Sequence, residues 1–176
     1  MSFVPKITEE QAPPELQPLF GKLKEHYGFV PNYFRALGRH PRLVERQMHL
    51  AEAVLGEGTL SAAQKEEILL VVSGINSSSY CVRAHLQMLH HLGVEESLGR
   101  QLAVDYASAA VDARDMALFE FAAKLTRTPD EITRRDVDSL YNEDWDENAL
   151  IETVLTVAWA NFINRVAFGL GLFMDE

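Results

Sequence analysis

The stretch SAAQKEEILLVVSGINSSSYCVRAHLQMLHHLG, residues 61–93, decides the fold that we expect for this chain. Its uninterrupted apolar run, residues 68–72, predicts a helix that is buried on nearly every side. Ser61 with Gln64 three residues later forms a capping-box pattern, which marks the start of this helix. The serine-rich elbow at 76–79 predicts that a second helix begins at Ser77 or Ser78, because serine is a good N-cap. We therefore expect two helices that meet at a polar elbow.

The second helix places Cys81 and His85 side by side on one inward-facing stripe, because residues four apart share a helix face. Cys81 also falls in the first turn, where unpaired backbone N–H groups favour a thiolate. The spacing leaves an alternative open, in which Cys81 is a small buried thiol and His85 a core histidine whose ring nitrogens are hydrogen-bonded. Glu66, on the first helix, is either an inward-facing carboxylate that needs a partner or a solvated first-turn acid.

A metal site is not expected in this stretch, and we predict no cofactor. His90 and His91 leave the helix face of His85, and a single thiol offers too few soft ligands for a structural zinc site.

Composition restricts the class of protein. With 176 residues and 47% hydrophobic content, the chain can bury the core of one domain, with or without an arm. A net charge of −10 argues against nucleic acid or an anionic membrane as a partner, because both would repel the protein. One cysteine cannot build an internal disulfide framework, which fits a reducing compartment. The first residues lack the pattern of a secretory signal, so we expect a cytoplasmic protein.

The flanking segments also predict helices. Pro13 and Pro14 suit the first turn of a helix that ends near Gly28, and Asn32 suits the N-cap of a helix over 33–37. We expect further helices after Pro41, over 95–106 and 115–125, from the capping-box pattern at 133–136 to 141, and from the acids at 144–147 onward. The phrase at 28–34 is interpreted as a structural turn.

The last of these helices is too polar to span a bilayer, because Glu152, Asn161, Asn164 and Arg165 interrupt its apolar run. We expect it to lie in the core or in a subunit interface. Its two asparagines and its arginine either line a pocket or make capping and interface hydrogen bonds.

The segment SSYCVRAH, residues 78–85, together with Lys65 and Glu66 ahead of the buried helix, resembles a known family. It is similar to the AhpD-like alkylhydroperoxidase branch of the carboxymuconolactone decarboxylase superfamily, and more closely to its peroxidase-related members. The family pattern is Glu-x11-Cys-x2-Cys-x3-His. Glu66, Cys81 and His85 match it, whereas Ser78 stands at the position of the first cysteine. Segments 29–37 and 161–171 also resemble this subfamily, so the likeness covers most of the chain.

This resemblance implies an all-α, AhpD-like multi-helix bundle that forms a homo-oligomer, with the helix–elbow–helix core carrying the site. The whole chain, 1–176, is then one domain. Residues 1–58 form an N-terminal helical arm, 59–127 the core with the motif, and 128–176 the C-terminal helices.

The resemblance also implies a thiol oxidoreductase that reduces hydrogen peroxide or small hydroperoxides. Glu66 would orient His85, which would activate Cys81, with Ser78 and Tyr80 in support. Because Ser78 cannot resolve an oxidised cysteine, an external thiol would have to act as reductant. Arg83, Asn161 and Arg165 are the expected substrate-binding residues. The alternative is a lyase that uses His85 and Glu66 on a small carboxylate, or a non-catalytic oligomer that binds a small molecule.

Overall fold

The structure, a computed structural model that describes residues 2–173, consists of nine α-helices and two short 3-10 helices. The α-helices are α1 (Gln17–Tyr27), α2 (Asn32–Leu37), α3 (Pro41–Leu55), α4 (Ala62–Ile75), α5 (Ser79–His91), α6 (Glu96–Asp105), α7 (Ala113–Arg127), α8 (Arg134–Asn142) and α9 (Glu147–Gly169). The 3-10 helices are η1 (Tyr106–Ser108) and η2 (Pro129–Glu131). No strand occurs among the described residues, which confirms the all-α prediction.

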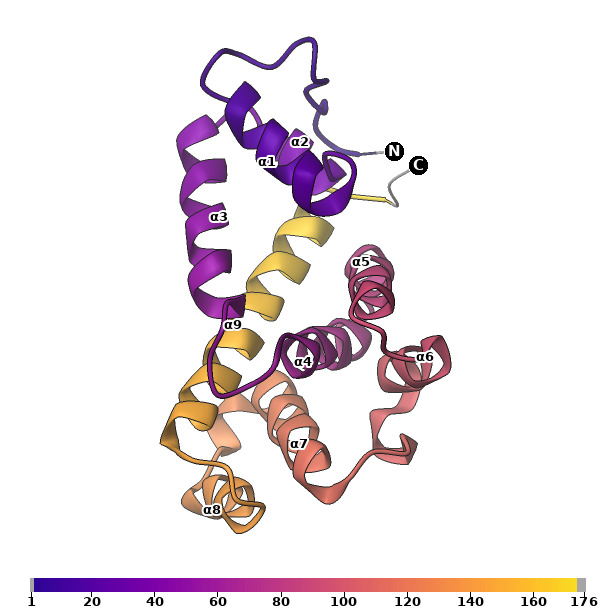
Figure 1. Cartoon of the computed structure of the whole chain (residues 1–176), viewed down its shortest axis with the longest axis vertical. Helices are drawn as coiled ribbons and strands as arrows, with labels where there is room; N and C mark the ends of the chain where they lie inside the picture. Colours follow the sequence, from indigo (N-terminus) through magenta and orange to yellow (C-terminus); the bar gives the residue numbers. More distant parts are fainter. Residues whose placement is uncertain (1, 174–176) are drawn as a thin grey trace.

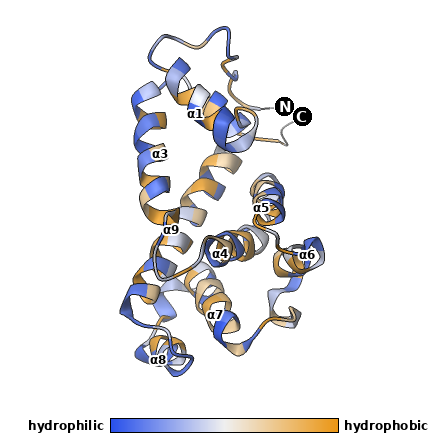
Figure 2. Ribbon diagram, in the orientation of Figure 1, coloured by the Kyte–Doolittle hydropathy of each residue, from blue (hydrophilic) through white to orange (hydrophobic). Residues whose placement is uncertain are grey.

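Helix α4 lies at the centre of the larger group of helices, with α5, α6, α7 and α9 packed around it (Figure 1). All five residues of its apolar run, 68–72, are at most 1% exposed, as the sequence predicts. Hydrophobic residues colour much of α4 in Figure 2, whereas α8 at the periphery is largely hydrophilic on its outer side. The central helix is therefore held mainly by apolar burial, the strongest favourable contribution to folding.

The core consists of two hydrophobic clusters. The larger one joins α4 with α5, α6, α7 and the first half of α9. The smaller one gathers residues of α1, α2 and α3 with the end of α9, and it includes Tyr80 and Cys81 from the start of α5. Helix α9 runs between the two groups of helices in Figure 1 and contributes to both clusters. Cys81 therefore lies where the N-terminal helices meet the central ones.

A partly buried ion pair connects α9 to α4 and to the segment that leads into it. The Lys65 Nζ lies 3.0 Å from the Glu152 Oε2 and also donates to the Gly56 carbonyl at 2.7 Å. The Glu152 carboxylate accepts from the backbone N–H groups of Thr59 and Leu60 as well. Such a pair needs additional hydrogen bonds to offset the cost of desolvation, and here backbone groups provide them.

Both predicted capping boxes are confirmed, at the starts of α4 and α8. The end of the first helix at Gly28 is also confirmed, since Gly28 caps α1 with a φ of 80°. Two local predictions were wrong. Pro13 and Pro14 precede α1, which begins at Gln17, and they belong to the turn that leads into it: the Pro13 carbonyl accepts from the N–H groups of Leu16 and Gln17. Asn32 is the first residue of α2 rather than its cap, a position that Pro31 takes.

Among residues 2–173, no helix combines the length and apolar character that crossing a membrane requires. The structure describes one chain, and the expected homo-oligomer stays a prediction, as does the cytoplasmic location.

Replacing Gly74 by alanine is expected to lower the free energy of unfolding by about 2 kcal/mol, the middle of the range for overpacking a core. A Cβ at this position in α4 would overlap the carbonyl oxygen of Ala103 in α6, and backbone cannot move aside as a flexible side chain can. Urea unfolding measures the change. Gly21→Ala in α1 is the matched control, because its Cβ would meet nothing within 4 Å. Equal stability of the two variants would show that α4 and α6 do not approach this closely.

Glu67 should make stability depend on pH. Burial, and then the nearby charge of Asp115, raise the pKa of this carboxyl from 4.5 to about 7. The folded state therefore holds its proton more tightly than the unfolded state. The resulting stability is complete below the unfolded pKa and is lost as pH rises through about 7. Between pH 5 and pH 8 the free energy of unfolding of wild type should fall by about 2 kcal/mol more than that of Glu67→Gln, after allowance for solvent screening.

Urea unfolding at both pH values checks this result. Glu120→Gln removes an exposed carboxylate from α7 and is the control. A difference between Glu67→Gln and wild type that stays constant with pH would mean that Glu67 does not titrate in this range.

Candidate functional site

The elbow between α4 and α5 sets the position of the thiol. Helix α4 ends at Ile75, Ser77 takes a left-handed conformation with φ 56°, and the Ser78 N–H donates to the Ser73 carbonyl at 2.9 Å. Helix α5 begins at Ser79, slightly later than predicted, and the hydroxyl of Ser78 does not cap it. That side chain is hydrogen-bonded to Cys81 instead, so the tight turn delivers the thiol to the first turn of α5 next to this hydroxyl.

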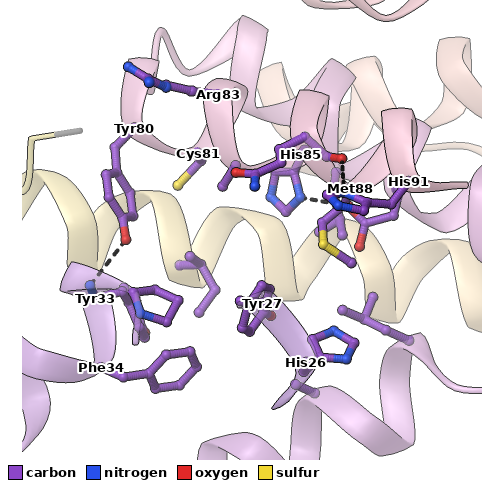
Figure 3. A pocket seen from close by; sticks show the side chains of 18 of the residues that line it. His26, Tyr27, Tyr33, Phe34, Tyr80, Cys81, Arg83, His85, Met88 and His91 are labelled. Atoms are coloured by element: carbon purple, nitrogen blue, oxygen red, sulfur yellow. Dashed lines mark hydrogen bonds and ion pairs between the residues drawn. The ribbon is translucent and has the colours of Figure 1, made fainter. Parts of the chain in front are cut away.

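Cys81 is only 2% exposed, and its sulfur is directed into the cavity described below (Figure 3). Burial raises the pKa of the Cys81 thiol, while hydrogen bonds with the side chains of Ser78 and Asn164 lower it by less. The net shift is upward, so at neutral pH the resting cysteine is a protonated thiol. Its position at a helix N-terminus does not outweigh burial, and another group has to accept its proton before it can react as a nucleophile.

Glu66 and His85 form a pair across α4 and α5. The His85 Nδ1 lies 2.8 Å from the Glu66 Oε2, and the side chains are 17% and 13% exposed. Because an ionised carboxylate only accepts hydrogen bonds, the hydrogen of a neutral His85 sits on Nδ1 and its Nε2 carries a free lone pair. The carboxylate can then stabilise the imidazolium that forms if Nε2 takes up a proton. This geometry decides between the two interpretations of Glu66 in favour of a partnered carboxylate.

A cavity of about 530 Å³ brings Cys81 and this pair together. Its walls come from both groups of helices. Figure 3 shows α5 along one side, with Cys81, His85 and Met88, and the N-terminal residues His26, Tyr27, Tyr33 and Phe34 on the other. Further lining residues are Gly28, Phe29, Pro31, Ala51, Leu55, Glu66, Leu69, Tyr80, Arg83, Ala84, Gln87, His91, Trp159 and Ile163.

The supporting residues predicted from the sequence have different positions. Tyr80 lines the cavity, and its hydroxyl accepts from the Tyr33 N–H at 3.1 Å, which ties α5 to α2. Arg83 also lines the cavity, although Figure 3 shows its guanidinium turned away from Cys81. Asn161 and Arg165 are not among the residues that line this cavity, and their predicted role in substrate binding stays a prediction. The Arg165 Nη1 donates to the Asn161 carbonyl and to its side-chain oxygen.

Two further residues touch the site. Sequence reasoning missed Tyr27, and it named Asn164 as a residue that either lines a pocket or makes hydrogen bonds. Tyr27, at the end of α1, is partly buried, and this burial together with the charge of Glu66 raises the pKa of its hydroxyl to about 12. It is therefore a neutral hydrogen-bond donor on the wall opposite α5. Asn164 of α9, 1% exposed, donates to the Ser73 hydroxyl at 3.1 Å and is hydrogen-bonded to Cys81. No spacing motif marks either residue, because both reach the site from distant parts of the chain.

The phrase at 28–34, interpreted from the sequence as a structural turn, supplies several cavity residues as well as the turn. Within the described part of the chain, no group of three or more histidine, cysteine and acidic side chains could hold a metal ion.

Comparisons with known proteins identify the family of this chain. The model of the carboxymuconolactone decarboxylase family matches residues 41–124. An uncharacterized peroxidase-related protein from Silicibacter sp. TM1040 is 30% identical, with a TM-score of 0.88 over 92% of this chain and 85% of that one. The chain therefore belongs to the carboxymuconolactone decarboxylase family, in its AhpD-like, peroxidase-related branch. The family predicted from the sequence is confirmed.

Two further solved structures show the same fold. The AhpD core of an uncharacterized peroxidase-related protein from Ralstonia eutropha JMP134 has a TM-score of 0.93 and 24% identity, over 99% of this chain and 93% of that one. A cysteine-to-alanine variant of the debrominase Bmp8, in complex with 2,3,4-tribromopyrrole, has a TM-score of 0.85 and 20% identity, over 98% and 91%. No curated protein matches the sequence.

Proposed function

We propose that this protein is a thiol oxidoreductase that reduces hydroperoxides through Cys81 and uses an external thiol as reductant. The observation that carries the proposal is that Cys81 and the Glu66–His85 pair line the same cavity. A nucleophile next to an oriented base is the arrangement that activates a thiol, and the family contains peroxidase-related proteins of this fold.

The first half-reaction consumes the peroxide. The Nε2 of His85 takes the Cys81 proton, directly or through a water molecule, and Glu66 stabilises the imidazolium. The thiolate then attacks one peroxide oxygen, so that a sulfur–oxygen bond forms and the oxygen–oxygen bond breaks. The leaving alkoxide takes the proton from His85. Cys81 ends as a sulfenic acid, oxidised by two electrons, and the hydroperoxide leaves as an alcohol.

The second half-reaction needs a partner thiol, because the sequence has one cysteine. Ser78, at the position where the family pattern has its first cysteine, has no redox chemistry. One external thiol condenses with the sulfenic acid, releases water and forms a mixed disulfide with Cys81. A second thiol attacks this disulfide, so that Cys81 is regenerated and the two external thiols leave as a disulfide. The two external thiols thereby supply the two electrons that reduced the peroxide.

Sulfenic-acid trapping tests the proposal directly. The reduced protein is treated with an equimolar hydroperoxide in the presence of dimedone, and the intact mass is then measured. We expect one dimedone adduct per chain, which must lie on Cys81 because the chain has no other cysteine. Parallel assays follow peroxide consumption with dithiothreitol. Unmodified protein that also fails to consume peroxide would exclude the proposal.

A lyase acting on a small carboxylate is the second candidate. Two observations favour it: the Glu66–His85 pair can transfer protons without the thiol, and Arg83, a cation suited to a carboxylate, lines the same cavity. Cys81 would then serve only as a buried wall residue. The Cys81→Ser variant separates this candidate from the first, as argued in the Discussion.

A further inference from the structure

The cavity is much larger than a small peroxide needs. A water molecule occupies about 30 Å³ in the liquid, and hydrogen peroxide is only slightly bulkier. The cavity measures about 530 Å³, within the range of about 300 to 1,000 Å³ that is typical of sites for drug-sized ligands. A hydroperoxide with a bulky organic part would fill it far better.

Five aromatic side chains lie on the wall that faces α5. Tyr27 and Phe29 come from the end of α1 and the turn after it, Tyr33 and Phe34 from α2, and Trp159 from α9. The Tyr33 and Phe34 rings are packed edge to face, with centroids 5.2 Å apart, so they present fixed surfaces (Figure 3). Aromatic rings pack favourably in offset or edge-to-face arrangements. The wall is therefore suited to a ring.

The aromatic wall carries no carboxylate, lysine or arginine. Glu66 and Arg83 lie on α4 and α5, and the imidazole on the aromatic wall is that of His26 in α1. Burial raises the pKa of Tyr33 as well as that of Tyr27, so both hydroxyls stay neutral. An anionic group on the aromatic wall would lose its hydration and would meet no lysine or arginine there. The ligand that fits this half of the cavity is uncharged.

We infer that the cavity binds a neutral aromatic ring against Tyr27, Tyr33, Phe34 and Trp159, and that this ring is carried by the hydroperoxide that Cys81 reduces. The second part rests on the function proposed above, whereas the binding of the ring does not. With the ring in place, the peroxide group lies toward the opposite wall, where α5 presents Cys81 and His85.

Two hydroperoxides that differ only in the ring test the inference. Cumene hydroperoxide has a phenyl group where tert-butyl hydroperoxide has a methyl group. We expect kcat/KM for the cumene compound to be at least about tenfold higher, a difference of about 1.4 kcal/mol in transition-state stabilisation. In Phe34→Ala the advantage of the cumene compound should largely disappear. Phe168→Ala is the matched control, since Phe168 is 54% exposed and lies outside the cavity.

Binding of 2-phenyl-2-propanol, the alcohol product, tests the ring site without any redox step. Titration calorimetry should show saturable binding to wild type and to Phe168→Ala, and at least about fivefold weaker binding to Phe34→Ala. If this pattern holds but no hydroperoxide is turned over, the ring site stands and the peroxidase proposal falls. If both hydroperoxides are reduced equally well and the alcohol does not bind, the ring site is wrong and the peroxidase proposal stands.

Discussion

Replacing Cys81 by serine is expected to lower thiol-dependent hydroperoxide reduction by at least about 10³-fold, because a hydroxyl neither forms a comparable nucleophile nor cycles through a sulfenic acid. The substitution is nearly isosteric, and serine can keep the hydrogen bonds that the Ser78 and Asn164 side chains make with residue 81. The fold should therefore survive, and thermal unfolding of the variant checks that it does. Peroxide consumption with dithiothreitol measures the loss.

The same variant decides between the two candidate functions. In a lyase that relies on Glu66 and His85, Cys81→Ser would keep its activity on the carboxylate substrate, since the thiol takes no part in proton transfer. In a thiol oxidoreductase, it would lose its activity on every hydroperoxide. A Cys81→Ser protein that still consumes hydroperoxide at the wild-type rate would contradict the proposed role of Cys81.

Glu66→Gln is expected to lower kcat/KM for hydroperoxides by about 10²-fold, the lower end of what general acid–base catalysis contributes. Glutamine can still accept the hydrogen bond from the His85 Nδ1 through its amide oxygen, so the ring keeps its orientation. It carries no negative charge, and the imidazolium that forms when His85 takes the thiol proton is less stable. Deprotonation of a thiol whose pKa is already raised by burial then becomes harder.

Glu67→Gln is the matched control for this experiment. It makes the same chemical change one residue along α4, on a side chain that lies outside the cavity. Steady-state rates of this variant should stay within about twofold of wild type, because it removes no group near the thiol. If Glu66→Gln behaved like Glu67→Gln, the ion pair with His85 would be structural only.

Much of the fold could be predicted because it follows from patterns within single segments. The apolar run of α4 predicts a helix without a solvent-exposed face, and in the structure all of its residues are buried. The pairs Ser61–Gln64 and Thr133–Asp136 cap helices through contacts three residues apart, which a sequence displays directly. The wrong predictions, at Pro13, Pro14 and Asn32, lie at helix ends, where several neighbouring residues can cap equally well and small differences in packing choose among them.

The candidate site divides in the same way. Cys81 and His85 share a face of α5 because they are four residues apart, so their proximity could be predicted from the sequence. Tyr27 and Asn164 reach the site only when α1 and α9 pack against α5. Arg165, a candidate cation for a substrate, does not line the cavity and is hydrogen-bonded to Asn161 on the same helix.

From residue types and spacing alone it follows that the chain is helical, that α4 is buried, that Cys81 and His85 are neighbours on one helix face, and that Ser78 stands where a resolving thiol would be. These properties depend on residue types and on helix periodicity. Only the tertiary structure decided that Glu66 is the partner of His85, that burial keeps Cys81 protonated at rest, and that aromatic residues of the N-terminal helices form the wall opposite the thiol. These features depend on how helices distant in sequence pack, and therefore on the sum of many weak apolar contacts that no local pattern contains.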